Sequence, residues 1–299
     1  MTQSHPFTGL GFRTGVVRDQ ATGWLLAFDP KLEADEEYFT FVSKWNAGTF
    51  GPARKNFFAV TCCVVTVPHQ ALILLAWDGH YGFVSPQVQA TGNIWEVGRP
   101  EPTATRHGDF RWVADVAGQA YAVGHMGTVY RLEAPKQWTR MDEELPRDFD
   151  IEAIHGFGPK DLYAVGKGGA VWHFNGERWS AREFPTNIGL TRVECAGDGN
   201  VYVAGHAGTL IRGRDQAWSV VDHQETDDDI WAVKWFDGAL YVATLSKLYR
   251  LRGDVLEPVD FGGETPKSFY HLSAAPGVMW SIGESEVLSF DGKRWTRLV

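Results

Sequence analysis

Apolar and polar positions along the chain repeat one pattern of short strands separated by glycine turns. In residues 161–179, a strand at 162–165 is followed by a glycine turn, a strand at 170–174, an Asn-Gly turn and a further strand that begins at Trp179. Short apolar runs bounded by turn residues are typical of antiparallel strands. The same order occurs again in residues 119–138, 200–218 and 278–295, and more weakly in residues 239–256.

The spacing of the copies gives the size of the repeating unit. An aromatic residue recurs at intervals of 42, 39, 39 and 39 residues, at Tyr121, Tyr163, Tyr202, Tyr241 and Trp280. The last strand of each copy contains Trp138, Trp179, Trp218, Leu256 or Trp295. An apolar pair marks an inner strand before each copy, at Phe110/Val113, Ile151/Ile154, Leu190/Val193, Ile230/Val233 and Phe269/Leu272. Each unit is therefore four short strands in about 40 residues.

Four antiparallel strands repeated at this interval are the signature of a β-propeller blade. Residues 110–299 hold five regular blades and residues 1–109 hold two divergent ones, so the sequence predicts an all-β, seven-bladed propeller that forms a single domain over residues 1–299. Six blades with an irregular N-terminal segment are the alternative. We expect the ring to close by packing of the first blade on the last, or by an added N-terminal strand.

The divergent region is predicted strand by strand. The expected strands are residues 12–18, 23–28, 38–45, 57–67, 71–77 and 93–97. The charged segment 31–37 is expected to be a loop, because no amphipathic helical period appears anywhere in the chain.

The residues of the repeat resemble those of a known group. The pattern Tyr-Ala-Val-Gly-x-x-Gly followed by Trp, as in residues 163–179, is similar to bacterial propellers with BNR-like repeats, which include photosystem-assembly-factor-like proteins. The design is also similar to that of WD-repeat proteins, without their Gly-His and Trp-Asp landmarks at the usual places. The Asp-box of sialidase-type repeats is approached only by residues 290–295. The resemblance implies the fold and assigns no function.

Charge and composition argue against several classes of partner. A net charge of −9 disfavours binding to nucleic acid or anionic membranes, since both need a basic surface. No window approaches the roughly 18 apolar residues of a membrane span. The N-terminus has no basic region followed by an apolar run, so no secretory signal is visible.

The three cysteines indicate a reducing compartment. Cys62, Cys63 and Cys195 are an odd number without a secretory signal, which favours free thiols and a cytoplasmic location. Cys62 and Cys63 are neighbours on an expected strand and point to opposite faces. We therefore expect one to be buried and the other less so, with no disulfide between them.

Histidines in two equivalent turns suggest a metal site near the ring axis. His125 and His206 stand in Gly-His-Met-Gly and Gly-His-Ala-Gly, and Lys167 and Glu284 hold that position in two other blades. Equivalent turns of different blades diverge with radius, so we interpret these as hairpin turns with a solvent-facing residue. The sequence therefore predicts no metal and no cofactor.

Titratable residues at the inner strands are the basis of an alternative function. Those at or near the strands are His155, His271, Glu152, Glu194, Asp115 and Lys234. A His/Glu pair across the central channel would suit a hydrolase- or lyase-type enzyme with its site at the channel mouth. No nucleophile elbow, His-Glu-x-x-His, phosphate loop or Rossmann fingerprint appears, so the sequence favours hydrated channel residues without a catalytic role.

The clearest signal outside the repeat is acidic. Two connections between blades, residues 141–150 and 222–229, are dense in carboxylates, and such connections share one face of the ring. We predict a docking face whose field steers a basic partner; plain solvated loops are the alternative. Residues 227–229 lack the alternating spacing and glycine of a calcium loop. The predicted docking residues are Asp142, Glu143, Glu144, Asp227, Asp228 and Asp229, with Trp231 as the aromatic anchor.

These observations favour a non-catalytic protein-binding propeller. An acidic single-domain binder of this kind fits an immunity or antitoxin-like protein that masks a basic toxin, and it fits an assembly scaffold equally well. The expected partner is a basic protein, with no nucleic acid and no membrane involved.

Overall fold

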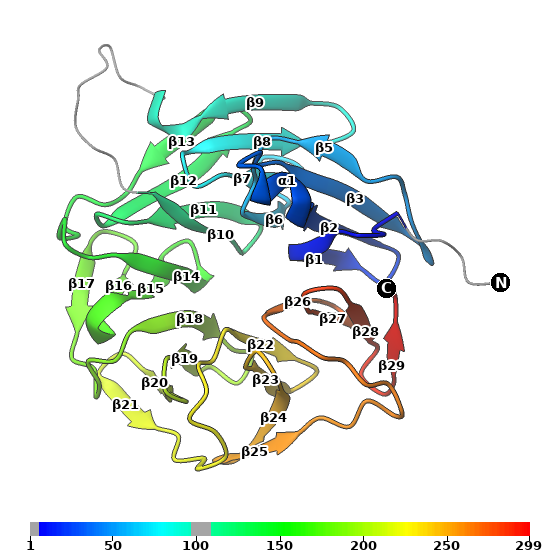
Figure 1. Ribbon diagram of the computed structural model, residues 1–299. Coiled ribbons are helices and arrows are strands. Elements are labelled where there is room, and N and C mark those ends of the chain that lie inside the picture. Colours follow the sequence, from blue (N-terminus) through cyan, green and yellow to red (C-terminus); the bar gives the residue numbers. More distant parts are fainter. Residues whose placement is uncertain (1–5, 97–108) are drawn as a thin grey trace.

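The computed structural model describes residues 6–96 and 109–299 of the chain. Within these residues the strands form seven antiparallel sheets around a central axis, so the molecule is a seven-bladed β-propeller (Figure 1). Each sheet consists of strands that are consecutive along the chain, and its first strand lies nearest the axis. The predicted all-β, seven-bladed fold is confirmed, and the six-bladed alternative is wrong.

The blades are numbered in chain order. Blade 1 contains β1 (Gly11–Asp19), β2 (Thr22–Phe28), β3 (Thr40–Asn46), β4 (Thr49–Phe50) and β5 (Arg54–Asn56), and blade 2 contains β6 (Thr61–Val65), β7 (Ala71–Leu75), β8 (His80–Val84) and β9 (Gln89–Asn93). Blade 3 contains β10 (Phe110–Val116), β11 (Gln119–Gly124), β12 (Thr128–Ala134) and β13 (Gln137–Arg140). Blade 4 contains β14 (Ile151–Gly158), β15 (Asp161–Gly166), β16 (Val171–Phe174) and β17 (Trp179–Arg182), with the short 3-10 helix η2 (Lys167–Gly169) between β15 and β16. Blade 5 contains β18 (Leu190–Cys195), β19 (Val201–Gly205), β20 (Leu210–Arg214) and β21 (Ala217–Val220). Blade 6 contains β22 (Ala232–Phe236), β23 (Ala239–Ala243), β24 (Leu248–Arg252) and β25 (Val255–Pro258), and blade 7 contains β26 (His271–Ala275), β27 (Val278–Ile282), β28 (Val287–Phe290) and β29 (Trp295–Arg297).

The two faces of the ring carry different loops. The turn between the second and third strands of a blade lies on the same face as the connections between blades, and we call this the connection face. Backbone hydrogen bonds join turns to connections there, from Gly127 N to Phe149 O (2.7 Å) and from Gly208 N to Asp228 O (3.0 Å). The opposite face, with the remaining hairpin turns, is the hairpin face. The two acidic connections therefore share one face, as predicted.

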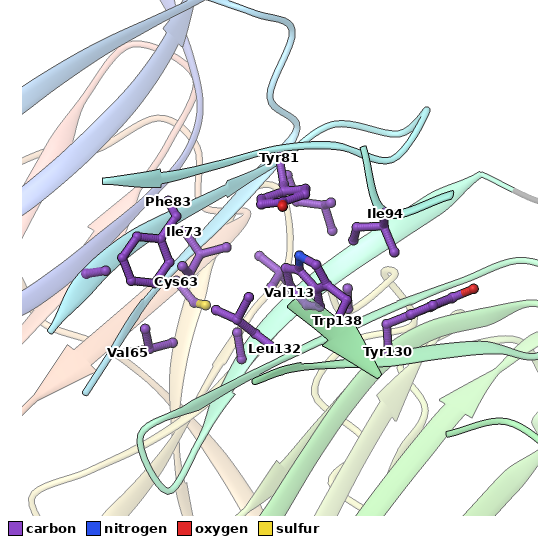
Figure 2. Packing of buried hydrophobic residues seen from close by; sticks show 14 of the residues in the cluster. Cys63, Val65, Ile73, Tyr81, Phe83, Ile94, Val113, Tyr130, Leu132 and Trp138 are labelled. Atoms are coloured by element: carbon purple, nitrogen blue, oxygen red, sulfur yellow. The ribbon is translucent and has the colours of Figure 1, made fainter. Parts of the chain in front are cut away.

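Aromatic side chains of the repeat fill the space between adjacent blades. Tyr163 and Trp179 are 0 % and 3 % exposed, as their recurrence in register predicts. Between blades 2 and 3, the rings of Tyr81 and Trp138 meet edge to face with centres 5.6 Å apart, and Leu132 packs in the same cluster (Figure 2). Such aromatic pairs contribute about 0.5–1.5 kcal/mol beyond the burial of their area.

Blade 7 closes the ring by packing against blade 1. Trp280 of β27 shares a cluster with residues of blade 1, and its ring lies 6.3 Å from that of Trp45. His271 Nε2 donates to Gly15 O (2.9 Å) across the same boundary. Within the described residues, blade 7 is built from β26 to β29 alone. Closure by packing of complete blades is therefore confirmed, and no N-terminal strand joins blade 7 in this part of the chain.

Two predictions of local structure in the divergent region are wrong. The charged segment contains a short helix, α1 (Pro30–Ala34), because Asp29 caps it by accepting from Lys31 N and Pro30 begins it. The strand expected at residues 93–97 ends at once, since Asn93 closes β9 and the 3-10 helix η1 (Ile94–Glu96) follows. Asn93 Oδ1 accepts from Trp95 N and starts that turn. Val97 lies outside the described residues.

The cysteine prediction is right about direction and wrong about exposure. Cys62 and Cys63 point into different clusters, one beside Leu72 and Leu74, the other between blades 2 and 3. Both are 5 % exposed, because each face of β6 is covered by a neighbouring blade. These two thiols and that of Cys195 are free. Among the described residues there is no helix with the length and apolarity that a membrane crossing demands.

Candidate docking face

The first acidic connection holds its carboxylates in two different ways. Asp142 is 4 % exposed and forms an ion pair with Arg140, so the structure removes it from the candidate docking residues. Glu143 and Glu144 are exposed. Glu144 Oε2 also accepts from Trp179 N (3.3 Å), which ties the connection to the outer strand of blade 4. Glu143 and Glu144 therefore present the charge of this connection to solvent.

The second acidic connection presents Asp227 and Asp228 to solvent and holds Asp229 against blade 5. Asp227 and Asp228 are exposed. Asp229 Oδ2 lies 2.9 Å from His206 Nδ1, and its Oδ1 accepts from Ala207 N (3.0 Å). The contact with His206 and then the bond from Ala207 hold the pKa of Asp229 below its usual value, so this carboxylate stays charged.

The two histidine turns are not part of any cluster of potential metal ligands in the described residues. His206 faces solvent as expected, and it also lies against Asp229. His125 stands in the equivalent turn of blade 3, and no group of three potential ligands occurs in residues 6–96 and 109–299.

A third acidic segment lies on the same face and was missed as a candidate. Asp35, Glu36 and Glu37 follow α1 in the turn between β2 and β3, and all three are exposed. The sequence marked this segment as charged, but blade 1 departs too far from the repeat for its face to be assigned from spacing. The carboxylates of the connection face therefore come from blade 1 and from two connections between later blades.

The mouth of the central channel opens at the centre of this face. A cavity of about 670 Å³ lies there, within the size range of ligand pockets. Trp231, the predicted anchor, lines it and meets the His206 ring edge to face at 5.8 Å. Two further apolar residues of the mouth are exposed, Trp77 at 47 % and Leu245 at 54 %. Trp77 and Leu245 were not predicted, because neither belongs to the repeated pattern.

Three side chains separate this cavity from the rest of the channel. Trp112, Arg192 and His271 come from blades 3, 5 and 7, each two residues after the apolar residue that marks its inner strand. The Arg192 guanidinium lies 4.3 Å from the centre of the Trp112 ring, whose centre is 5.6 Å from that of His271. Ala153 and Ala232 hold the equivalent positions of blades 4 and 6. We call Trp112, Arg192 and His271 the waist of the channel.

Burial sets the charge of the waist. It lowers the pKa of Arg192 to about 10 and that of His271 to about 3. Arg192 is therefore still a cation at neutral pH, whereas His271 is neutral and donates from Nε2 to Gly15 O.

Beyond the waist, two of the polar side chains pair with each other and a third accepts from the backbone. Lys234 Nζ donates to Glu194 Oε2 (3.0 Å), and Cys195 N donates to His155 Nδ1 (2.9 Å). Burial lowers the pKa of His155, so its ring is neutral, and Nδ1 already accepts a backbone proton donor. Burial also raises the pKa of Asp115 to about 6. The contacts of Lys234, Glu194 and His155 hold these side chains in place in the far half of the channel.

Comparison with known proteins gives a relative over nearly the whole chain. No protein-family model matches. The chain is 38% identical to the immune protein Tsi7 of Pseudomonas aeruginosa in an alignment of 295 residues that covers 95% of this chain and 96% of that protein.

Solved structures of low identity share the fold. The chain resembles YCF48 bound to a D1 peptide, with a TM-score of 0.68 and 12% identity over 95% of this chain and 92% of that one. It also resembles the WD40 propeller of Doa1, with a TM-score of 0.71 and 9% identity over 95% and 93% of the two chains. The expected likeness to photosystem-assembly-factor propellers is confirmed at the level of the fold.

Proposed function

Because the chain belongs to the family of the immune protein Tsi7, we propose that it is an immunity protein that binds a toxin and blocks its activity. The observation that carries the proposal is the identity of 38% over 95% of the chain. The match extends through all seven blades, so the binding surface is to be sought on the ring itself.

The connection face is the proposed binding surface. Glu143, Asp227 and Asp228 are exposed there, and the mouth adds the exposed apolar side chains of Trp77 and Leu245. Clustered carboxylates attract a basic protein from a distance, while aromatic and aliphatic side chains supply the area that a bound partner covers. A toxin with a basic binding surface suits both features.

The proposed place of action is the cytoplasm. Free thiols that are buried in the core, such as Cys62, Cys63 and Cys195, suit a reducing compartment. An immunity protein in that compartment meets a toxin after the toxin has entered the cell.

The test is neutralisation by the purified pair. The tagged chain is used to capture proteins from its native cells, and each captured protein is expressed alone in a bacterial host. We expect one of them to stop growth and co-expression of the chain to restore it. A captured protein that is harmless, or a toxic one whose effect the chain does not relieve, would overturn the proposal.

A further inference from the structure

The channel mouth contains an arginine that forms no ion pair within the described part of the chain. Arg192 Nη1 donates to Thr191 O (2.6 Å), the carbonyl of the preceding residue, and the guanidinium stacks on the Trp112 ring. Its side chain lines the cavity on both sides of the waist. In residues 6–96 and 109–299 no carboxylate forms an ion pair with it. The remaining N–H groups of Arg192 therefore lack an acidic acceptor in the described residues.

Burial lowers the pKa of Arg192 and the charge of Glu152 is near enough to raise it, but the neighbouring carboxylates are bound to other side chains. Glu152 Oε2 accepts from Arg111 Nε (3.1 Å), and Asp150 lies 3.8 Å from Lys167. Asp229 pairs with His206 at the edge of the mouth. Arg192 is therefore a cationic centre of the mouth. The exposed carboxylates of the same face, Glu143, Asp227 and Asp228, together with Asp229, form what we call the acidic rim.

A carboxylate is the group that fits this centre. A guanidinium presents parallel N–H donors that match the two oxygens of a carboxylate, and stacking on an aromatic ring holds the fork in place. The side chain of Arg192 is half-buried, and removal of the remaining water when a partner binds strengthens such a pair.

The surroundings favour a side chain on a protein loop over a small free anion. Trp77 and Leu245 stand exposed at the mouth, and a small anion at Arg192 leaves them in contact with water. A loop that reaches the waist covers both and contributes apolar contact. The cavity of about 670 Å³ accommodates a few side chains and excludes a whole domain.

We propose that the toxin inserts a loop into the channel mouth and that an aspartate or glutamate of this loop binds Arg192. This inference rests on the proposed function and adds a site to it. The partner then has a protruding carboxylate surrounded by basic residues, which complements the cationic centre and acidic rim. A partner without the central carboxylate covers the half-buried Arg192 and leaves it unpaired, so the same site contributes to selection among toxins.

The test measures the affinity of the captured toxin for variants of the chain by isothermal titration calorimetry. Arg192→Ala is expected to weaken binding by about 30-fold or more, because loss of one partner leaves the other charge buried and unpaired. Arg192→Lys keeps the positive charge but loses the paired N–H donors of the guanidinium. Its affinity for the toxin is expected to lie between those of the parent and Arg192→Ala. Arg178→Ala, an exposed arginine of the hairpin face, is the matched control and should bind like the parent.

Variants of the toxin keep the test independent of the fold of the chain. Each exposed carboxylate of the toxin is changed to its amide. One change is expected to weaken binding to the parent and to have little further effect on binding to Arg192→Ala, which has already lost the pair. Inorganic phosphate and acetate are titrated into the parent chain alone. If Arg192 variants bind the toxin within threefold of the parent, the inference is wrong and the proposed immunity function is unaffected. Binding of phosphate or acetate that requires Arg192 then assigns the site to a free anion. A parent chain that binds no toxin overturns both proposals.

Discussion

His206 Nδ1 lies 2.9 Å from Asp229 Oδ2 and joins a turn of blade 5 to the connection that enters blade 6. The His206 ring also meets Trp231 edge to face, so three residues form one line of contact from the acidic rim to the channel mouth. The sequence offered the turn histidine, the acidic connection and the tryptophan as separate features. In the fold, the rim is fixed in position relative to the mouth.

The first prediction concerns this contact. Gly208 N donates to Asp228 O of the connection. His206→Ala should loosen the connection and speed hydrogen exchange at Gly208 N. The expected increase is only about threefold, because exposed ion pairs contribute little to stability. The melting temperature should hardly change. Hydrogen exchange by mass spectrometry checks this, with His125→Ala in the equivalent turn of blade 3 as the control. Equal exchange in both variants would show that the pair does not hold the connection.

The second prediction concerns the core between blades. Trp179 is 3 % exposed and donates from Nε1 to Met141 O, at the start of the first acidic connection. Trp179→Ala should destabilise the protein by about 3–5 kcal/mol, the usual effect of removing a buried tryptophan side chain. Trp218→Ala removes the equivalent, partly exposed residue of blade 5 and should cost less. Urea unfolding measures both, and equal losses would contradict the role given to burial.

The repeat made the fold predictable, because Tyr163, Trp179 and their counterparts recur wherever two sheets meet. The docking residues were harder to predict. In the sequence Asp142 is indistinguishable from its acidic neighbours Glu143 and Glu144. In the fold it is buried in an ion pair with Arg140, and only the packed structure shows that contact.

The waist was visible in part. Side chains alternate between the two faces of a strand, so the residue two positions after each apolar marker lies on the same face as the marker. Trp112, Arg192 and His271 could have been grouped by this spacing. Whether Arg192 forms an ion pair in the described residues depends on the direction of the Glu152 side chain. In this fold Glu152 is bound to Arg111 and not to Arg192. Trp77 and Leu245 were beyond prediction, since their exposure depends on how seven blades place their loops around one mouth.

The third prediction is a pH dependence that arises at the waist. Burial first, and then the nearby charge of Arg192, lower the pKa of His271 to about 3, below the value of about 6.5 in an unfolded chain. Between these two values the unfolded state binds a proton at His271 and the folded state does not. The contribution of His271 to the free energy of unfolding is therefore complete above pH 6.5 and decreases as the pH falls toward 3.

His271→Gln isolates this effect, since an amide keeps a donor for Gly15 O and does not titrate. Between pH 7 and pH 4.5 the parent should lose about 2 kcal/mol more stability than this variant. Urea unfolding at the two pH values gives the difference, and His125→Gln serves as the control. Parallel losses in the parent and His271→Gln would mean that His271 is protonated without penalty in the fold.

The last prediction concerns the rim. If the connection face binds a basic toxin, exchanging Asp227, Asp228 and Asp229 for Asn should slow association about tenfold at low salt and change dissociation little, because rim charges act mainly on encounter. Added salt should reduce the difference, since the Debye length is about 8 Å at physiological ionic strength and screens distant charges. Folding should be almost unaffected, because exposed carboxylates contribute little to stability. A triple exchange of Asp215, Asp237 and Asp254 removes the same charge from the hairpin face and should leave association unchanged. Surface plasmon resonance against the captured toxin at two salt concentrations separates the two triples. Equal association rates for both would make the acidic connections solubility features, and binding would then depend on the mouth alone.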